Sequence, residues 1–448
     1  MPGPGHYRHY SWEHSYFSGK TRSYLRYKQR MGGLETGFED VLATQDLIMG
    51  LLIPRSGSNT VPQLEAPDGT WIQDTAEIID FCESAHPSPP VLPGPSRPRQ
   101  DLASYLVELL ADEWMVVHGF WERWHFSLEG DWPCHLRFNE QQWGAILNPN
   151  ADGEARRASA GQFFELAFGI SQPHTDPRGV YAGLLQLGCD ANTESAWEAS
   201  SLRILKRLEE HFSVHDFTLG GLPALGDFGL MAPLYAHLFR DAVPGGALAL
   251  HFPLVTEWVE RTNGNNALNA RTYDQKLYSL DENSKLVPRP ATSDGGAWLD
   301  ADKVPATLLP LLAIFFEEMW PVLRDSIRTL SAYIASDAHV AGAELPGKTF
   351  TASPGFEHLQ TGEGALTQDF QIGGSSGRRM VTAYHAWRLQ RVARALNSYD
   401  TQGREAVADM LSTFPDGLEL LELDGMLGGC PIRKEGGQLF SQAPRSTT

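Results

Sequence analysis

Two serines, Ser15 and Ser18, stand where a short strand is expected to run into a helix, in the stretch HSYFSGKTRSYLRYK. The free N–H groups of a first helical turn and a serine hydroxyl both stabilise an anion. The alternative is that either serine only caps the helix, which is a common position for serine. Tyr16 carries a third hydroxyl and is a weaker candidate.

Two further motifs flank a predicted hairpin whose turn is carried by the sequence PDG at 67–69. Val61 and Pro62 precede the hairpin, and proline is the residue for which a cis peptide bond costs little. Asp74 and Thr75 open the predicted helix TAEIIDFCES. A hydroxyl and helix N-terminal amides suit a carboxylate ligand, and an aspartate suits an ammonium group. The alternatives are an ordinary trans-proline at an edge strand and a plain helix cap.

An aromatic stripe lies in the sequence DEWMVVHGFWERWHF. Its members are spaced by four, three and four residues, so they share one face of a helix. Such a face forms either an aromatic wall for a flat, apolar ligand or an ordinary packing surface between helices. The stripe consists of Trp114, His118, Trp121 and His125.

Strand-like and helix-like patterns alternate over about residues 6 to 85 in the order β-α-β-α-β-β-α. The proline-rich stretch HPSPPVLPGPSRPR cannot continue a helix and is expected to be a stiff linker. The chain after it is expected to be mostly helical, with a less periodic insertion at about 127–195 and a loop-rich part at 263–303. The clearest helices are expected at 99–126, 197–213, 224–240, 252–262, 304–335 and 379–397.

The composition excludes several classes of protein. The chain has 448 residues, 42% of them hydrophobic, which is enough for a buried core and more than one domain. Its 36 Lys and Arg against 55 Asp and Glu give a net charge of −19, which disfavours nucleic acid or an anionic membrane as a partner. The four scattered cysteines suggest neither a disulfide framework nor a zinc site, so a cytoplasmic location is expected. The N-terminal residues lack an apolar signal core. The most apolar segment, VPATLLPLLAIFF, is too short to span a membrane and is expected to be a buried helix.

Three stretches around the linker together resemble the cytosolic glutathione S-transferases: SYFSGKTRSYL, TVPQLEAPDGTWIQDTAEIIDFCE and GGLPALGDFGLMAPLYAHLFRD. The resemblance covers roughly residues 6–262 and implies an α/β plus all-α fold. It implies a thioredoxin-like glutathione-binding domain at 1–88 and an all-helical transferase domain at 97–262 with the insertion at about 127–195. The remaining residues, 263–448, resemble the extended tail of a less characterised bacterial branch, and we expect a mostly helical extension packed on the helical domain.

The resemblance also assigns roles to the motifs. It places Ser15 opposite the glutathione sulfur, where omega-type members carry a cysteine and zeta-type members a serine, and Ser18 at the second cysteine of a thioredoxin C-x-x-C. The site would then hold a thiolate but could not form a disulfide with it. For the carboxylate of the glycine end, Arg55 and Lys20 both remain candidates. The implied glutathione-binding residues are Val61, Pro62 in the cis form, Asp74 and Thr75.

The expected function is that of a glutathione transferase that activates the thiol with a serine hydroxyl. The thiolate would attack an apolar, aromatic electrophile held by Tyr16 and the aromatic stripe. Glutathione is the expected co-substrate, no metal is expected, and dehalogenation and ether cleavage share the same first step. A homodimer is compatible with the resemblance. The alternatives are a transferase-fold binding or scaffold protein without catalysis and a glutaredoxin-like thiol transferase, which is disfavoured because no cysteine lies near Ser15.

Two sequence features concern structure more than chemistry. In ALGDFGLM, Asp227 is placed to close a helix-capping box, but Ala224 replaces the hydroxyl residue, so half of the cap is missing, at a cost on the order of 1 kcal/mol. The helix expected at 379–397 is basic in an acidic protein. It is expected either to cover the cleft, with Tyr384, Trp387 or Arg388 reaching the ligand, or to act as a buttress elsewhere.

Overall fold

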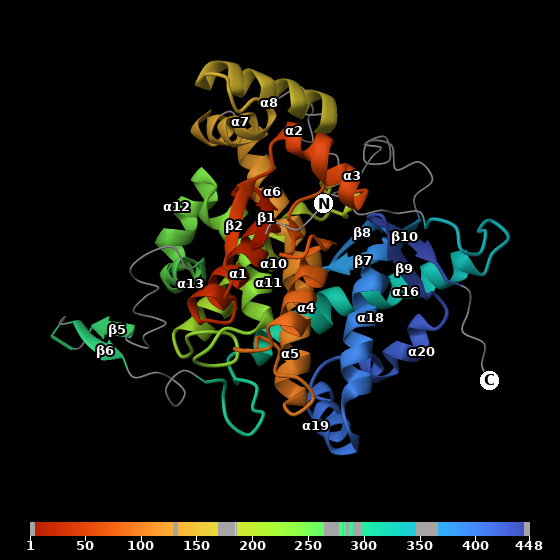
Figure 1. Ribbon diagram of the computed structural model, residues 1–448. Coiled ribbons are helices and arrows are strands. Elements are labelled where there is room, and N and C mark those ends of the chain that lie inside the picture. Colours follow the sequence, from red (N-terminus) through yellow and green to blue (C-terminus); the bar gives the residue numbers. More distant parts are fainter. Residues whose placement is uncertain are drawn as a thin grey trace.

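A computed structural model describes residues 5–128, 133–168, 184, 186–263, 277–280, 282–283, 286–289, 297–345 and 366–442. We call residues 5–85 the N-terminal domain, residues 98–263 the helical domain and residues 297–442 the C-terminal segment. In Figure 1 the end of the C-terminal segment, in blue, stands beside α4 and α5 of the first two parts. The C-terminal segment packs against both earlier parts of the chain.

The N-terminal domain is built on a four-stranded sheet in the order β2-β1-β3-β4. Its first two strands are parallel and joined by a helix, while the last two are antiparallel and followed by a helix. This is a thioredoxin-like arrangement, so the predicted fold class is confirmed for this part. The elements are β1 (Tyr7–Ser11), α1 (Ser18–Arg30), β2 (Phe38–Leu42), α2 (Gln45–Leu47), α3 (Ile53–Ser56), β3 (Gln63–Glu65), β4 (Trp71–Gln73) and α4 (Thr75–Ala85).

Helix α1 buries basic side chains as well as apolar ones. Lys20, Arg22 and Lys28 are all buried, so each needs an acidic or polar partner to offset the loss of hydration. Arg22 Nε donates to Asp40 at 2.5 Å, and Lys28 Nζ lies 2.8 Å from a carboxylate oxygen of Glu83. Three of the basic residues that follow the two serines, Lys20, Arg22 and Lys28, therefore belong to the interior and not to a surface patch.

The helical domain is organised around a long helical run that includes a π-helical stretch, Leu110–Trp114. Helix α11 packs against this run so closely that two of its glycines have no room for a side chain. A Cβ on Gly226 would lie 3.0 Å from Val107, and one on Gly229 would lie 2.8 Å from the Cα of Glu108. The helices are α5 (Pro98–Leu109), α6 (Met115–Leu128), α7 (Pro133–Leu147), α8 (Gly153–Phe168), α10 (Glu194–Phe212), α11 (Leu225–Pro233), α12 (Ala242–His251) and α13 (Pro253–Asn263).

The segment expected to be a less periodic insertion contains regular structure. Helices α7 and α8 form an antiparallel pair that lies above α2 in Figure 1. Gly144 lets the two helices approach closely, because a Cβ there would lie 2.2 Å from the carbonyl oxygen of Arg156. The aromatic residues of this pair, which carry no clear sequence periodicity, become important for the site.

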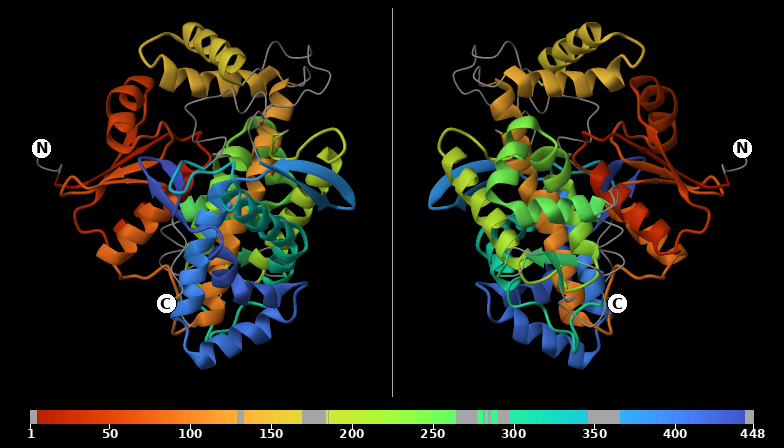
Figure 2. Two further views of the ribbon diagram at one scale, coloured as in Figure 1. Left: turned by 90° about the vertical axis from the view of Figure 1, so that its right-hand side faces the viewer. Right: turned by 90° about the vertical axis from the view of Figure 1, so that its left-hand side faces the viewer.

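The C-terminal segment combines helices with short hairpins, and Figure 2 shows its last hairpin lying against the N-terminal domain. The helix predicted at 379–397 begins later, at Ala383, where the Thr382 side chain accepts a hydrogen bond from the backbone N–H of His385. Its first predicted residues belong to a strand. The elements between residues 277 and 442 are β5 (Leu277–Leu280), β6 (Leu286–Arg289), α15 (Leu309–Ile314), α16 (Trp320–Ile334), β7 (Thr367–Ile372), β8 (Ser375–Met380), α18 (Ala383–Ser398), α19 (Thr401–Leu411), α20 (Leu423–Leu427), β9 (Ile432–Glu435) and β10 (Gln438–Ser441).

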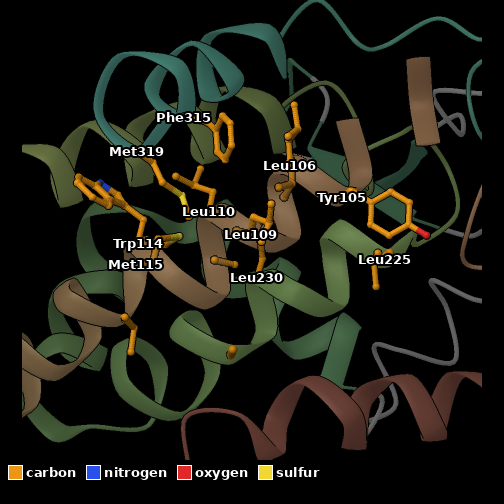
Figure 3. Packing of buried hydrophobic residues seen from close by; sticks show 14 of the residues in the cluster. Tyr105, Leu106, Leu109, Leu110, Trp114, Met115, Leu225, Leu230, Phe315 and Met319 are labelled. Atoms are coloured by element: carbon orange, nitrogen blue, oxygen red, sulfur yellow. The ribbon is translucent and has the colours of Figure 1, made fainter. Parts of the chain in front are cut away.

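The C-terminal segment shares one hydrophobic core with the helical domain. Figure 3 shows Phe315 and Met319 covering Leu110 and Trp114 from one side, while α11 packs from the other side. All four of these side chains are buried. The apolar stretch VPATLLPLLAIFF is thus an interior element, and no helix in the described ranges has the length and apolar character needed to cross a membrane.

The Asp227 carboxylate, which forms half of the capping box of α11, also accepts hydrogen bonds from outside the helix. Asp227 accepts hydrogen bonds from the backbone N–H of Ala224 at 2.9 Å, from the backbone N–H and the hydroxyl of Thr218 at 2.9 and 2.6 Å, and from the Trp258 indole N–H at 3.2 Å. Burial raises the pKa of this carboxyl to about 6, although all four donors oppose the shift. Asp227 therefore supplies its half of the capping box and also ties α11 to the loop at Thr218 and to α13.

We expect Asp227→Ala to lower the free energy of unfolding by roughly 3 kcal/mol or more, because it leaves four buried donors without an acceptor. Thr218→Val is the matched control, since it removes only one of these donors and should cost about 1 kcal/mol. Denaturant unfolding of both variants measures the difference. Equal losses for the two variants would contradict the shared role of this carboxylate.

Candidate functional site

A cavity of about 470 Å³ lies where the N-terminal domain, the helical domain and the C-terminal segment meet. This volume falls in the range of about 300–1,000 Å³ that is usual for small-molecule sites. One part of the wall is polar and comes from the N-terminal domain and the C-terminal segment. Another part is aromatic and comes from the first loop, α6 and the α7–α8 pair. The cavity can therefore take a ligand with one polar and one apolar portion.

The structure separates the three candidate hydroxyls. Ser15 lines the cavity, and its hydroxyl has only a long contact of 3.5 Å to the carbonyl oxygen of Val61. The Tyr16 hydroxyl donates to the carbonyl oxygen of Ala111 at 2.6 Å, and burial raises the pKa of this tyrosine well above 10. Ser18 is fully buried, and its hydroxyl accepts from the backbone N–H of Trp12 at 3.2 Å. The Ser15 hydroxyl is thus the one of the three that is least engaged by the fold.

The motifs on either side of the hairpin reach the same wall as Ser15. Val61 and Pro62 line the cavity, and the peptide bond between them is cis. Asp74 and Thr75 also line it, at the end of β4 and the start of α4. Sequence positions about 60 residues apart are therefore assembled into one polar surface.

Asp74 combines a structural role with a position in the cavity wall. Its side chain caps α4 by accepting from the backbone N–H of Ala76 at 2.9 Å. Its backbone has a φ of 97°, which is unusual for a residue other than glycine and is a form of strain found at functional sites. The Tyr384 hydroxyl donates to the other carboxylate oxygen. Burial acts to raise the pKa of Asp74, but Lys434 and Arg388 outweigh it and hold the pKa below its ordinary value, so the carboxylate stays charged.

The aromatic stripe of α6 and the turn before it faces away from the cavity. The Trp114 indole donates to Glu318 at 3.1 Å, and the Trp121 indole donates to Glu194 at 2.7 Å. His118 packs edge-on against Trp197, and His125 stacks on Trp121. The stripe is therefore the packing surface against α10 and the C-terminal segment. The prediction that these four residues line the pocket assigned the wrong face of the helix.

The aromatic wall comes from a different face of α6, from the first loop and from the α7–α8 pair, and most of its residues were not singled out from the sequence. Trp12 and Trp143 meet edge to face with ring centroids 4.8 Å apart, and Trp143 stacks on Phe163 at 5.1 Å. The described aromatic residues that line the cavity are Trp12, Tyr16, Phe17, Phe120, Trp124, Trp143, Phe163 and Tyr384. The described histidines that line it are His14, His237 and His385.

A buried charge cluster borders the polar wall and joins all three parts of the chain. Lys20 Nζ donates to Glu108 at 2.7 Å and to Asp112 at 2.5 Å. Arg388 Nη2 lies 3.2 Å from Glu108 and 2.9 Å from Asp112, and Arg391 donates to Glu108 as well. Burial acts to raise the pKa of Glu108, but the three cations lower it well below its ordinary value. Because Lys20 is held in this cluster, it is not available for a ligand carboxylate.

The comparisons with known proteins return solved structures only. No family model matches the chain, and no curated protein matches it. A glutathione S-transferase from Rhodospirillum rubrum is similar with a TM-score of 0.35 and 14% identity, covering 63% of this chain and 96% of that chain. A beta-etherase from a Sphingobium species is similar with a TM-score of 0.37 and 16% identity, covering 60% and 98%. Glutaredoxin 2 from Salmonella typhimurium, solved in complex with glutathione, is similar with a TM-score of 0.32 and 13% identity, covering 59% and 98%.

We expect Arg388→Met to lower the free energy of unfolding by roughly 3–5 kcal/mol, because it leaves Glu108 and Asp112 short of a buried cation. Arg394→Met on the same helix is the control, since Arg394 is exposed, and it should change stability by less than about 0.5 kcal/mol. Chemical denaturation measures both. If the two variants were equally stable, the cluster would not hold the C-terminal segment in place.

Proposed function

We propose that this protein is a glutathione transferase in which the Ser15 hydroxyl stabilises the thiolate of bound glutathione. The observation that carries the proposal is the arrangement of the cavity wall. Ser15, the Val61–Pro62 backbone and the Asp74–Thr75 pair share one polar surface, and an aromatic wall adjoins it at the same serine. A thiol tripeptide fits the polar part, and a flat apolar reactant fits the aromatic part.

The Ser15 hydroxyl is suited to a sulfur anion because its hydrogen bond within the protein is long and weak. Its contact to Val61 is long, so the hydroxyl can turn and donate to a ligand atom without losing a strong bond. A hydrogen bond to the charged form of a group lowers its pKa, and the start of α1 adds a positive field in the same region. The thiol proton leaves to solvent, and the sulfur is then ready to react.

In the reaction, the thiolate attacks an electrophilic carbon and forms a carbon–sulfur bond. In a substitution, the bond to the leaving group breaks and the leaving group departs with the electron pair of that bond. In an addition, a π bond of the acceptor breaks, its electron pair moves onto the acceptor, and the acceptor then takes a proton from solvent. The aromatic wall supports an aromatic electrophile, because stacked and edge-on rings contribute both buried area and geometry. Trp12, Phe120 and Trp143 are the residues we assign to this contact.

Thiol–disulfide exchange is less well supported by the site than transfer. It would require a cysteine beside the glutathione sulfur. Cys82, Cys189 and Cys430 are buried, Cys134 is exposed, and none of these four is among the described residues that line the cavity. A transferase-fold protein that binds without turnover is the other alternative, and binding and turnover assays separate it from an enzyme.

Calorimetric titration of the full chain with glutathione tests the proposal directly, with ultraviolet difference spectroscopy to follow the bound thiolate. We expect saturable binding and a thiol pKa below the ordinary value of about 8.5 in the complex. Absence of binding would reject the function. Binding with an unshifted thiol and no turnover of aromatic electrophiles would favour the scaffold alternative.

For Ser15→Ala we expect turnover to fall about ten- to hundredfold with glutathione affinity nearly unchanged, because one hydrogen bond to a charged group is lost. The thiol pKa of bound glutathione should rise accordingly. Ser18→Ala is the control, since the Ser18 hydroxyl serves the backbone of Trp12, and it should affect stability more than turnover. Turnover that survives Ser15→Ala would assign the thiolate contact to another group.

For Trp143→Leu we expect the KM for an aromatic electrophile to rise about tenfold, with the affinity for glutathione unchanged, because an aromatic contact in the pocket is lost. Trp121→Leu is the matched control, since Trp121 belongs to the stripe that faces away from the cavity. Steady-state kinetics with several electrophiles measures both. A larger effect from Trp121 than from Trp143 would restore the original assignment of the helix face.

A further inference from the structure

The last hairpin of the C-terminal segment forms part of the cavity wall. Its turn, Gly436-Gly437, lies directly against the loop that precedes Val61. A Cβ on Gly57 would come within 2.2 Å of the carbonyl oxygen of Gly436, and a Cβ on Gly437 would come within 2.9 Å of the Ser58 side chain. Each of these three glycines has a positive φ. The close fit fixes the position of β9 relative to the polar wall.

Lys434 of β9 is held at the polar wall beside the start of α4. Its ammonium group donates to the carbonyl oxygen of Gln73 and to the carboxylate of Glu77, and it lies 5.3 Å from the ring centroid of Trp387. The side chain is 12% exposed and lines the cavity. An ammonium group has three N–H donors. The two protein acceptors leave one donor for a ligand.

The other cations near the cavity are already committed. Arg123 lines it, but its guanidinium is bound to Asp241 at 2.7 and 3.0 Å and to the carbonyl oxygens of His14 and Ala236. Lys20 and Arg388 belong to the buried charge cluster and are not among the described lining residues. The acidic lining residues are Asp74, Asp112 and Glu113. In the described part of the wall, a ligand carboxylate therefore finds its compensating charge at Lys434.

We propose that Lys434 binds the α-carboxylate at the γ-glutamyl end of glutathione while Asp74 binds the neighbouring ammonium group, so that the C-terminal hairpin completes the tripeptide site. A positive and a negative side chain on one wall are complementary to an α-amino acid head, which carries both charges on one carbon. Each Asp74 oxygen has one donor in the structure, from Ala76 or Tyr384, and can accept another. The proposal rests on the proposed function, because glutathione must bind for the contact to form.

The test compares two ligands and four full-length proteins by calorimetry. The ligands are glutathione and 4-aminobutyryl-cysteinyl-glycine, which lacks only the α-carboxylate. The proteins are the wild type, Lys434→Met, Lys434→Arg and Glu77→Gln. Glu77→Gln is the matched control, because it breaks the ion pair that anchors Lys434 while keeping the cation, and Glu77 does not line the described cavity wall.

We expect the wild type to bind glutathione about ten- to hundredfold more tightly than the analogue. Lys434→Met should lose about the same factor for glutathione and change the affinity for the analogue less than about threefold. Lys434→Arg and Glu77→Gln should keep the preference for glutathione. If Lys434→Met lowered the affinity for both ligands equally, or if Glu77→Gln lowered the two affinities in the same way as Lys434→Met, Lys434 would only anchor the hairpin.

If Lys434→Met does not fold, the wild type and Lys434→Arg still test the proposal. The wild type alone must prefer glutathione to the analogue, and Lys434→Arg must retain that preference. A wild type that binds both ligands equally overturns the proposal while leaving the proposed function intact. A wild type that binds neither ligand overturns both.

Discussion

The buried charge cluster around Glu108 and Asp112 is the constraint on which the arrangement of this protein depends. Lys20 approaches it from the N-terminal domain, and Arg388 and Arg391 approach it from the C-terminal segment. Moving such ions out of water costs several kcal/mol each unless every one finds a partner. The three parts therefore cannot be placed independently. The geometry that pairs these charges also fixes where the three parts enclose the cavity.

Because of this arrangement, the cavity has one polar and one aromatic wall. Its polar wall comes from the thioredoxin-like sheet and the C-terminal segment, and its aromatic wall from the first loop, α6 and the α7–α8 pair. Ser15 lies where the two walls meet, between Trp12 and Tyr16 in the chain. A nucleophile held there would face an apolar reactant without crossing a polar surface. In the proposed reaction, the short loop after β1 thus contributes both to the thiolate contact, through Ser15, and to the aromatic wall, through Trp12 and Tyr16.

The C-terminal segment belongs to the site as well as to the core. Phe315 and Met319 pack on the helical domain, while Tyr384 bonds to Asp74 and Lys434 lies at the start of α4. Helix α18 therefore has both of the roles that the sequence left open, covering the cleft and acting as a buttress. Arg388 and Arg391 act as a buttress through buried ion pairs, and the first turn of the same helix, at Tyr384 and His385, lines the cavity.

The sequence by itself determined the features that depend on neighbours along the chain. The strand-to-helix joint at Ser15, the hairpin turn before Asp74 and the long apolar helices follow from turn chemistry and periodicity, which act over a few residues. Tertiary structure decided which surface each element meets. Periodicity placed Trp114 and Trp121 on one face but could not say whether a ligand or α10 covers it. Lys434 and Asp74 are brought together only by folding, because charge pairing and close packing between distant segments leave no local pattern in the sequence.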